Sequence, residues 1–227
     1  MISPKIGIVY KNSLSTMLYG SISHGFSPPT LEETLLPDGL INSTIEPESG
    51  WNYEIGSRGQ LFKNTVYFDI AIYRMNVKNL LVARRTNNDE YMGVNAGKTQ
   101  YNGLEFTLKN TFIKTKNITL FGFHSFAYND FKFKKFIDDS NDYSNNLLTG
   151  VPKLTYNATI GLESLNGFYT SVNYSFVGEI PLRDDNSVYS DEYQIINTQF
   201  GYQSNTNNNF QYNFLVGINN LTNSKYA

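Results

Sequence analysis

The sequence predicts an all-β protein, an antiparallel β-barrel that crosses a membrane with its strands. Three observations favour this fold: apolar and polar residues alternate with a period of two, the alternating segments are long, and the connections are alternately short and long. A tilted strand needs about 9–11 residues to cross a bilayer, whereas strands of soluble sandwiches have about 5–6. Short turns at one end and long polar loops at the other are typical of outer-membrane barrels.

The composition fits such a barrel and excludes several other classes of protein. The 227 residues include 17 Tyr and 16 Phe but only 17% charged residues, and the formal net charge is −2. A chain without a basic field is a poor nucleic-acid binder, and no apolar run is long enough for a membrane helix. The absence of cysteine excludes a disulfide, a thiolate zinc site and a thiol nucleophile, and two histidines are too few for a His-rich metal centre. We therefore expect no nucleic-acid partner, no metal and no cofactor.

Ten strands are expected along the chain. Residues 51–58 and 154–162 alternate without interruption, with Asn, Glu, Gly and Arg on the polar side of the first segment. Alternation is least regular in 118–129, where Phe121 and Phe123 fall out of phase with Leu120 and Phe126. The ten segments are 4–10, 13–22, 51–62, 65–76, 99–109, 118–129, 152–163, 167–177, 192–203 and 210–219.

The connections between these segments alternate in length. Short turns are expected at 11–12, 63–64, 110–117, 164–166 and 204–209, and long loops at 23–50, 77–98, 130–151 and 178–191. Aromatic residues near the strand ends are expected to form girdles at the two membrane interfaces: Tyr10, Tyr19, Phe62, Tyr73, Tyr128 and Phe176.

A soluble β-sandwich or lipocalin-like barrel of ten long strands is the alternative. Such a protein keeps its apolar face inside and carries charge outside. Here the polar face is mostly Asn, Ser, Thr and Gly, which suits a wide water-filled lumen better than a surface in bulk solvent. The pattern therefore favours the membrane barrel.

Four blocks of sequence resemble the barrel of TonB-dependent outer-membrane receptors. Residues 45–59 resemble the family's L-x-P-E-x-x-x-x-Y-E-x-G segment, and 95–105 match its N-A-G-x-T-x-x-x-G-x-E hairpin. Residues 3–33 and the block 216–226, similar to V-x-N-L-x-x-x-x-Y, complete an ordered match over almost the whole chain.

The resemblance implies a barrel of about 22 strands around an N-terminal plug domain, located in the outer membrane of a Gram-negative bacterium. Residues 1–227 would form one partial barrel domain of about ten strands, the C-terminal half of the wall, with the plug domain and the last strand absent. Ten strands that closed by themselves would need a tightly filled interior, but their polar faces carry small Ser, Gly and Asn. With no visible signal peptide at the N-terminus, we expect a fragment or a truncated gene product.

The resemblance also implies a function and partners. Family members bind a scarce ligand from outside and import it with energy from the inner-membrane TonB complex. The leading hypothesis is uptake of a ferric siderophore or similar iron chelate, with the TonB complex reached only through the absent plug, and with outer-membrane lipid and lipopolysaccharide as surroundings. Haem, cobalamin or a glycan is the alternative cargo, and a passive structural or adhesive barrel is the alternative of another class.

Candidate ligand-binding residues lie in the long loops that should face outside. Arg84 and Arg85 can recognise the carboxylates of anionic ferric chelates, and Tyr91 can stack on catecholate or hydroxamate groups. The alternative for the arginines is a solvated pair matched by Asp89 and Glu90, or a lipopolysaccharide contact.

His24 stands where the family often has Arg, and a haem receptor would use a loop histidine as an axial ligand. Residues 26–29 only partly resemble the haem-receptor F-R-A-P box, and no histidine falls between Pro29 and Glu46, so haem is disfavoured.

Charged residues on the polar faces of strands form a second candidate set. Glu54, Arg58 and Glu105 are expected to face the lumen, where they contact the plug or water as readily as a ligand. We expect no catalytic residue, because no Ser–His or Asp–His constellation, phosphate loop or His-Glu-x-x-His motif is visible, and His124 has no identifiable partner. The protein is therefore not expected to be an enzyme.

Overall fold

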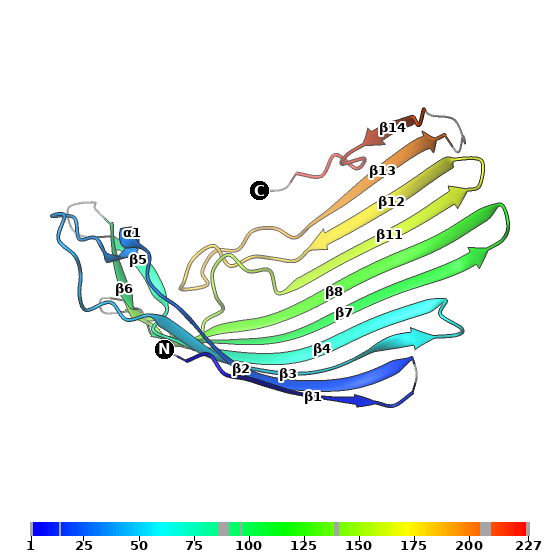
Figure 1. The fold of residues 1–227 in the computed structure, drawn as a ribbon. Coiled ribbons are helices and arrows are strands. Elements are labelled where there is room, and N and C mark those ends of the chain that lie inside the picture. Colours follow the sequence, from blue (N-terminus) through cyan, green and yellow to red (C-terminus); the bar gives the residue numbers. More distant parts are fainter. Residues whose placement is uncertain are drawn as a thin grey trace.

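The computed structural model describes residues 2–13, 15–85, 91–95, 97–138, 141–204 and 210–225, with the backbone alone at 83–85 and 91. Ten antiparallel strands form one sheet, in which each strand pairs with its neighbours along the chain (Figure 1). The ten strands are β1 (Lys5–Lys11), β2 (Thr16–Ser27), β3 (Glu48–Leu61), β4 (Val66–Lys78), β7 (Lys98–Lys114), β8 (Ile118–Lys135), β11 (Leu154–Ser164), β12 (Phe168–Val177), β13 (Tyr193–Gln203) and β14 (Asn213–Ile218).

The remaining elements lie in the long connections. These are the helix α1 (Leu31–Thr34), the hairpin of β5 (Leu81–Arg85) and β6 (Tyr91–Asn95), and the small hairpin of β9 (Ile137–Asp138) and β10 (Asn141–Asp142). Within the described ranges, no helix has the length and apolar character needed to span a bilayer.

All ten predicted strands are confirmed. At the short-turn end β7 continues to Lys114, into the predicted turn 110–117, and most of the other differences lie at the long-loop end. There β2 continues to Ser27, β3 begins at Glu48 and β8 continues to Lys135, so these strands extend into the predicted loops. The hairpins β5–β6 and β9–β10 were predicted as loop. Short strands of this kind are set by pairing within the loop rather than by a long alternating pattern, which explains why periodicity missed them.

The register assigns every strand residue to one of two faces. On the apolar face, one cross-strand row contains Ile8, Gly20, Ile55, Ile72, Leu104 and Tyr128. The next row, on the polar face, contains Val9, Tyr19, Gly56, Ala71, Glu105 and Ala127. Ile8, Ile55 and Ile72 are 75%, 65% and 55% exposed, so the apolar face is not covered by the chain itself. A soluble sandwich or lipocalin-like barrel would bury this face, and the structure therefore does not match that alternative.

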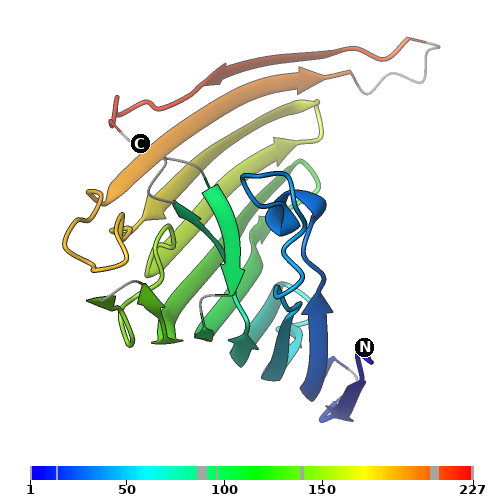
Figure 2. The same ribbon diagram turned by 90° about the vertical axis from the view of Figure 1, so that its left-hand side faces the viewer.

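The sheet is curved but not closed. β1 and β14 are its two edge strands and do not pair with each other. Figure 2 shows the strands following an arc, with α1 and the β5–β6 hairpin on its concave side. Tyr101 and Phe131, which belong to the polar face, pack against loop residues there, so the polar face is the concave one.

The irregular pattern of 118–129 has a local explanation. Phe121 and Phe123 lie on the polar face, whereas Leu120 and Phe126 lie on the apolar face. The Phe121 ring covers Gly161 of β11, where a Cβ atom would lie only 2.3 Å from the ring. An aromatic ring over a cross-strand glycine keeps the sheet packed at a position without a side chain. Two of the expected girdle residues, Tyr19 and Tyr73, likewise lie on the polar face, opposite Gly56 and Gly103, rather than on the apolar face with Tyr10 and Tyr128.

Candidate functional site

The four long connections gather at one end of the sheet. They join β2 to β3, β4 to β7, β8 to β11, and β12 to β13, and they lie together at the left of Figure 1. Because alternate connections of an antiparallel sheet meet at the same end, this grouping follows from the strand order. The candidate binding region is therefore the set of these four loops above the concave face.

Two of these connections share a small apolar core. Phe133, Phe136 and Leu148 of the β8–β11 region are each at most 8% exposed, and the Phe133 and Phe136 rings lie 4.6 Å apart. Leu80 and Val82 reach this core from the β4–β7 connection, so two loops are joined by apolar packing. The β4–β7 and β8–β11 loops thus pack against each other and form part of a cap, rather than extending separately into solvent.

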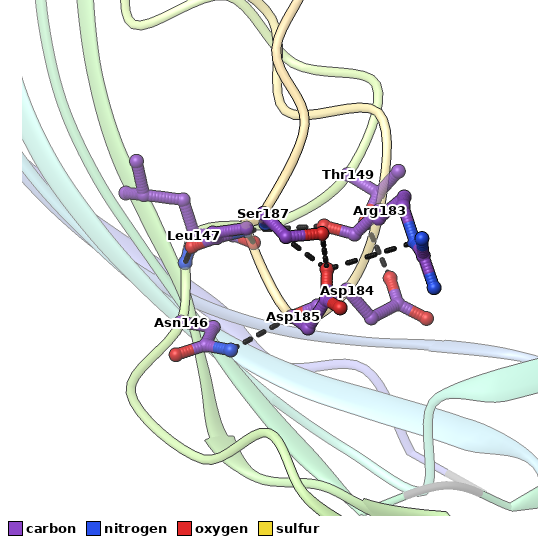
Figure 3. A network of polar contacts seen from close by, with 8 residues as sticks. Asn146, Leu147, Thr149, Arg183, Asp184, Asp185 and Ser187 are labelled. Atoms are coloured by element: carbon purple, nitrogen blue, oxygen red, sulfur yellow. Dashed lines mark hydrogen bonds and ion pairs between the residues drawn. The ribbon is translucent and has the colours of Figure 1, made fainter.

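The β8–β11 and β12–β13 loops are joined by hydrogen bonds, and Figure 3 shows those of Asn146 and Thr149 to Asp184. The Leu147 backbone N–H donates to the Asn186 side-chain oxygen at 2.7 Å, and the Asn186 amide donates back to the Leu147 carbonyl at 3.0 Å. Asn146 donates to the Asp184 carbonyl at 2.8 Å, and the Thr149 hydroxyl donates to the Asp184 carboxylate. These contacts connect residues about 38 positions apart and hold the two loops in one arrangement.

The tip of the β12–β13 loop is ordered by a carboxylate. Asp185 accepts hydrogen bonds from the Ser187 backbone N–H at 3.0 Å and from its hydroxyl at 2.6 Å, and the Arg183 Nε lies 3.7 Å away. The Ser187 hydrogen bonds are the main cause that lowers the pKa of the Asp185 carboxyl below its ordinary value. The ionised carboxylate is thus the form that this turn stabilises.

The β2–β3 connection is tied to the β5–β6 hairpin. The Glu46 backbone N–H donates to the Asn95 side chain at 2.8 Å, and the Glu46 carboxylate accepts from Asn79 at 2.7 Å. The Leu81 backbone N–H donates to Glu48 at 2.6 Å. Within the same connection, Thr30 and Glu33 form a capping box at the start of α1. Together with the apolar core, these bonds link all four loops.

The predicted ligand-contacting residues Arg84, Arg85 and Tyr91 come together in the β5–β6 hairpin. Arg85 pairs with Tyr91, and Arg84 with Met92, as direct cross-strand neighbours. The side chains of Arg84, Arg85 and Tyr91 lie outside the described part of the structure. Their backbone positions place both arginines and the tyrosine beside the hairpin turn, at the end of the sheet where the loops gather.

His24 was predicted in a loop, and that placement was wrong. It belongs to β2 and pairs with Trp51 of β3, on the apolar face that also carries Ile22. Its Nδ1 lies 3.3 Å from the Ile2 carbonyl oxygen, and its ring centre lies 4.9 Å from that of Trp51. The ring is thus packed at the rim of the sheet, away from the concave side.

Glu54, Arg58 and Glu105 all lie on the polar, concave face, as the alternation predicted. Glu54 interacts with the Tyr19 hydroxyl, and the Arg58 guanidinium lies 5.3 Å from the centre of the Tyr19 ring. Charges from two strands, β3 and β7, therefore line this face of the wall, and the two from β3 lie beside Tyr19.

Sequence reasoning missed two further charged residues on the same face. Asp69 stands opposite Arg58 and accepts a hydrogen bond from the Tyr67 hydroxyl at 3.2 Å. Lys109 lies 5.6 Å from the centre of the Tyr67 ring. The signal that could have found Asp69 and Lys109 is their position in the alternating pattern of strands 65–76 and 99–109.

A comparison with protein families decides what kind of wall this is. Residues 1–221 match the family model described as TonB dependent receptor-like, beta-barrel. The chain belongs to this family.

Solved structures with the same fold are receptors or transporters by name. The siderophore receptor PiuA from Acinetobacter baumannii superposes with a TM-score of 0.74 at 20% identity, over 97% of this chain and 31% of the receptor. BauA, the ferric preacinetobactin receptor from Acinetobacter baumannii, superposes with a TM-score of 0.73 at 18% identity, over 98% of this chain and 32% of BauA. The copper transporter OprC superposes with a TM-score of 0.73 at 15% identity, over 99% of this chain and 34% of OprC.

The chain spans about a third of the length of these structures, and at such identities the similarity shows the fold alone. The open ten-stranded sheet is thus a portion of a TonB-dependent receptor barrel, as predicted. Such receptors are outer-membrane proteins of Gram-negative bacteria and transporters rather than enzymes.

His124, which the sequence left without a partner, is hydrogen-bonded within the TonB-dependent receptor barrel. Its Nδ1 lies 2.8 Å from the Tyr156 hydroxyl, on the apolar face that also carries Leu108 and Ala158. A histidine held by a tyrosine on that face is a packed residue of the wall. In the described ranges, no group of three or more His, Asp or Glu residues has the geometry to hold a metal ion.

Proposed function

We propose that this chain forms part of the wall and entrance of a TonB-energised outer-membrane receptor that takes up a ferric siderophore or a similar iron chelate. The observation that carries the proposal is the linked cap of four loops above a polar, concave wall. Similarity to the siderophore receptor PiuA and the ferric preacinetobactin receptor BauA supports iron chelates as the cargo.

In this proposal the ligand binds first among the loops and then passes along the polar face. Glu54, Arg58 and Glu105 line that route and contact the plug domain of the complete receptor, through which the TonB complex acts. A face of hydrated charges and small polar residues gives a polar cargo a path that avoids the bilayer.

The charge of the loops favours the β5–β6 hairpin as the place where an anionic chelate binds. Residues 136–153 and 178–192 contain eight acidic and two basic residues. This side of the cap repels an anionic chelate, whereas Arg84 and Arg85 attract one and offer bidentate hydrogen bonds to carboxylates. Tyr91, the cross-strand neighbour of Arg85, would add a ring for stacking.

The experiment is ligand binding by the full-length receptor with Arg84→Ala and Arg85→Ala combined. We expect the double variant to lose about tenfold or more in affinity for an anionic ferric chelate, because each arginine contributes a charge-assisted hydrogen bond. Arg183→Ala is the matched control, since it removes a loop arginine from the acidic side and should leave binding unchanged.

If the double variant bound every ferric chelate tested as well as the unmodified receptor does, the β5–β6 hairpin would not be part of the binding site. Growth tests under iron limitation, with ferric siderophores, haem, cobalamin, glycans or copper supplied separately, distinguish the candidate cargoes. A receptor that supports uptake of none of these when TonB is active would instead be a passive barrel.

A further inference from the structure

A cavity lies inside the cap of loops, on the concave side of the sheet. Its volume is about 330 Å³, which falls in the range of about 300–1,000 Å³ found for small-molecule pockets. Three of the four long connections and the sheet itself contribute to its walls. We refer to this cavity as the cap pocket, whose lining includes Val82, Tyr101, Phe133, Phe136, Asp138 and Asp184.

Aromatic rings form one wall of the cap pocket. Phe133 and Phe136 are each 5% exposed, and their ring centres lie 4.6 Å apart. Tyr101 lies on the concave face beside them, and its ring packs edge-on against Phe131, with 4.9 Å between the ring centres. Because neighbouring side chains hold these rings, the pocket is preformed, and this wall suits an apolar group.

Two carboxylates complete the lining. Asp138 belongs to β9 and Asp184 to the β12–β13 loop, and both are half-buried. The Thr149 hydroxyl donates to Asp184 (Figure 3), which uses one of about four acceptor positions of that carboxylate. Arg183, which precedes Asp184 in the sequence, has its Nε 3.7 Å from Asp185 instead. No Lys or Arg is among the described residues that line the pocket, so its charge favours a cation.

The kind of cation follows from the rest of the lining. A calcium or magnesium ion takes about six or more oxygen ligands, and no group of three or more His, Asp or Glu residues in the described ranges could hold one. A protonated amine needs fewer partners, because it donates charge-assisted hydrogen bonds to carboxylates and is attracted by the faces of aromatic rings. Since the other walls are aromatic and aliphatic, such an amine would stand at the end of an apolar arm.

The cap pocket is close to the proposed place of chelate binding. Val82 lines the pocket, and the Arg84 backbone follows two residues farther along β5, a distance of about 7 Å in a strand. The two places differ in charge, since the hairpin contains two arginines and the pocket two carboxylates. A single molecule with an anionic part and a cationic arm would contact both.

We propose that the cap pocket binds a protonated amine at the end of an apolar arm of the imported iron chelate, and that Asp138 and Asp184 recognise this amine. The inference rests on the proposed uptake of an iron chelate, and it narrows the substrate class to chelates that carry both charges. A purely anionic chelate would bring its own charge against the two carboxylates. A chelate with a neutral arm would cover them without supplying a counter-charge.

The first test uses the arm alone, so that it does not depend on which chelate is imported. N-acetylcadaverine, which carries one protonated amine, and its neutral diacetylated form are titrated separately into the full-length receptor in detergent micelles. Binding is measured by saturation-transfer NMR of each compound. We expect the receptor to bind the amine, and to bind the diacetylated form about tenfold or more weakly.

Asp138→Asn combined with Asp184→Asn removes both charges and keeps the shape of the side chains. This paired variant should bind N-acetylcadaverine about tenfold or more weakly, because the charge-assisted hydrogen bonds are lost. Asp191→Asn is the matched control, since Asp191 is an exposed carboxylate of the β12–β13 loop that does not line the pocket. Val151→Phe fills the pocket without changing its charge and should also weaken binding. If the paired variant does not reach the outer membrane, the two single substitutions replace it.

The second test uses an anionic ferric tris-catecholate chelate with a primary amine on an alkyl arm, and the same chelate with the amine acetylated. We expect the unmodified receptor to bind the amine form about tenfold or more tightly than the acetylated form. The paired variant of Asp138 and Asp184 should bind both forms alike. Arg84→Ala with Arg85→Ala should weaken the binding of both forms and keep their ratio.

The outcomes separate this inference from the proposed function. Equal binding of the two chelates by the unmodified receptor, with binding still lost in the double arginine variant, would overturn the amine site and leave iron-chelate uptake in place. If the receptor bound N-acetylcadaverine through Asp138 and Asp184 but took up no iron chelate, the assignment of the amine to such a cargo would fail together with the proposed function.

Three further results would overturn the assignment of the pocket. One is unchanged affinity for N-acetylcadaverine in the paired variant of Asp138 and Asp184. Another is an equal loss in Asp191→Asn, which would mean that the general acidity of the loops attracts the amine. The last is displacement of the amine by calcium chloride at constant ionic strength, which would make the pocket a site for a divalent cation.

Discussion

The ring of Tyr73 in β4 covers Gly103 of β7, its direct cross-strand neighbour on the polar face. A Cβ atom on Gly103 would lie 2.2 Å from the tyrosine Cζ, so the ring fills the space that a side chain would take. The same arrangement recurs at Tyr19 with Gly56 and at Tyr169 with Gly201. These pairs pack large rings against the wall and keep the concave side open.

Gly103→Ala is therefore expected to destabilise the barrel. The new methyl group displaces the Tyr73 ring, and overpacking of this kind costs about 1–3 kcal/mol. Unfolding of the full-length protein in urea, followed by loss of the folded band on unheated gels, measures the change. Gly20→Ala is the control, because its Cβ meets nothing closer than 3.8 Å and should leave stability unchanged or raise it slightly. Equal stability of Gly103→Ala and Gly20→Ala would show that the Tyr73 ring moves aside without loss of folding free energy.

Asn186→Ala is expected to release the β12–β13 loop from the β8–β11 loop. The substitution removes both hydrogen bonds to the Leu147 backbone and leaves alanine at a φ of 53°. Hydrogen exchange of the Leu147 amide should become faster, since that N–H loses its acceptor. Asn186→Gly separates the two causes, because glycine accepts the backbone angle but also lacks the amide. Slow exchange in the glycine variant would mean that the side-chain bonds do not hold the loops.

The turn of Asp185 is expected to loosen in acid. The folded-state pKa of Asp185 lies below its unfolded value, so the stabilisation is complete above the ordinary Asp pKa of about 3.9 and is lost as the pH falls through the lower folded value. Exchange of the Ser187 amide, followed from neutral pH downward, should quicken in that range after correction for intrinsic exchange. In Ser187→Ala the main hydrogen-bond donor is gone, and the Asp185 pKa measured by NMR should rise. A Ser187→Ala variant with an unchanged pKa would contradict this assignment.

Thr99→Val is expected to leave stability unchanged or to raise it. Thr99 is 1% exposed, and its hydroxyl has no hydrogen-bond partner among the described residues. Valine has nearly the same shape and removes the penalty of a buried, unpaired hydroxyl, which is about 1–3 kcal/mol. Thr159→Val is the matched control, because the Thr159 hydroxyl donates to Asn173 at 2.7 Å and its loss should destabilise. Both are measured by the same urea unfolding, and a destabilised Thr99→Val would reveal a partner for that hydroxyl.

Several features of the site depended on contacts that alternation does not report. The positions of Glu54, Arg58 and Glu105 on one face followed from the period of two, because a strand sends successive side chains to opposite sides. The placement of His24 in a strand and of Arg85 beside Tyr91 depended on where pairing stops at the long-loop end. Pairing there is set by hydrogen bonds and packing between neighbouring strands and loops, so periodicity alone locates the strand end only to within a few residues.

The amino-acid sequence by itself determined the all-β class, the ten strands, their alternating short and long connections and the family. These are local properties, since each strand needs only its own alternating pattern and each family block only its own residues. The tertiary structure decided which rings cover which glycines, how Asn186 joins two loops, and that Lys78, Lys98 and Lys135 stand in one row. The physical reason is that register and loop packing are set by contacts between residues tens of positions apart, which no single strand pattern contains.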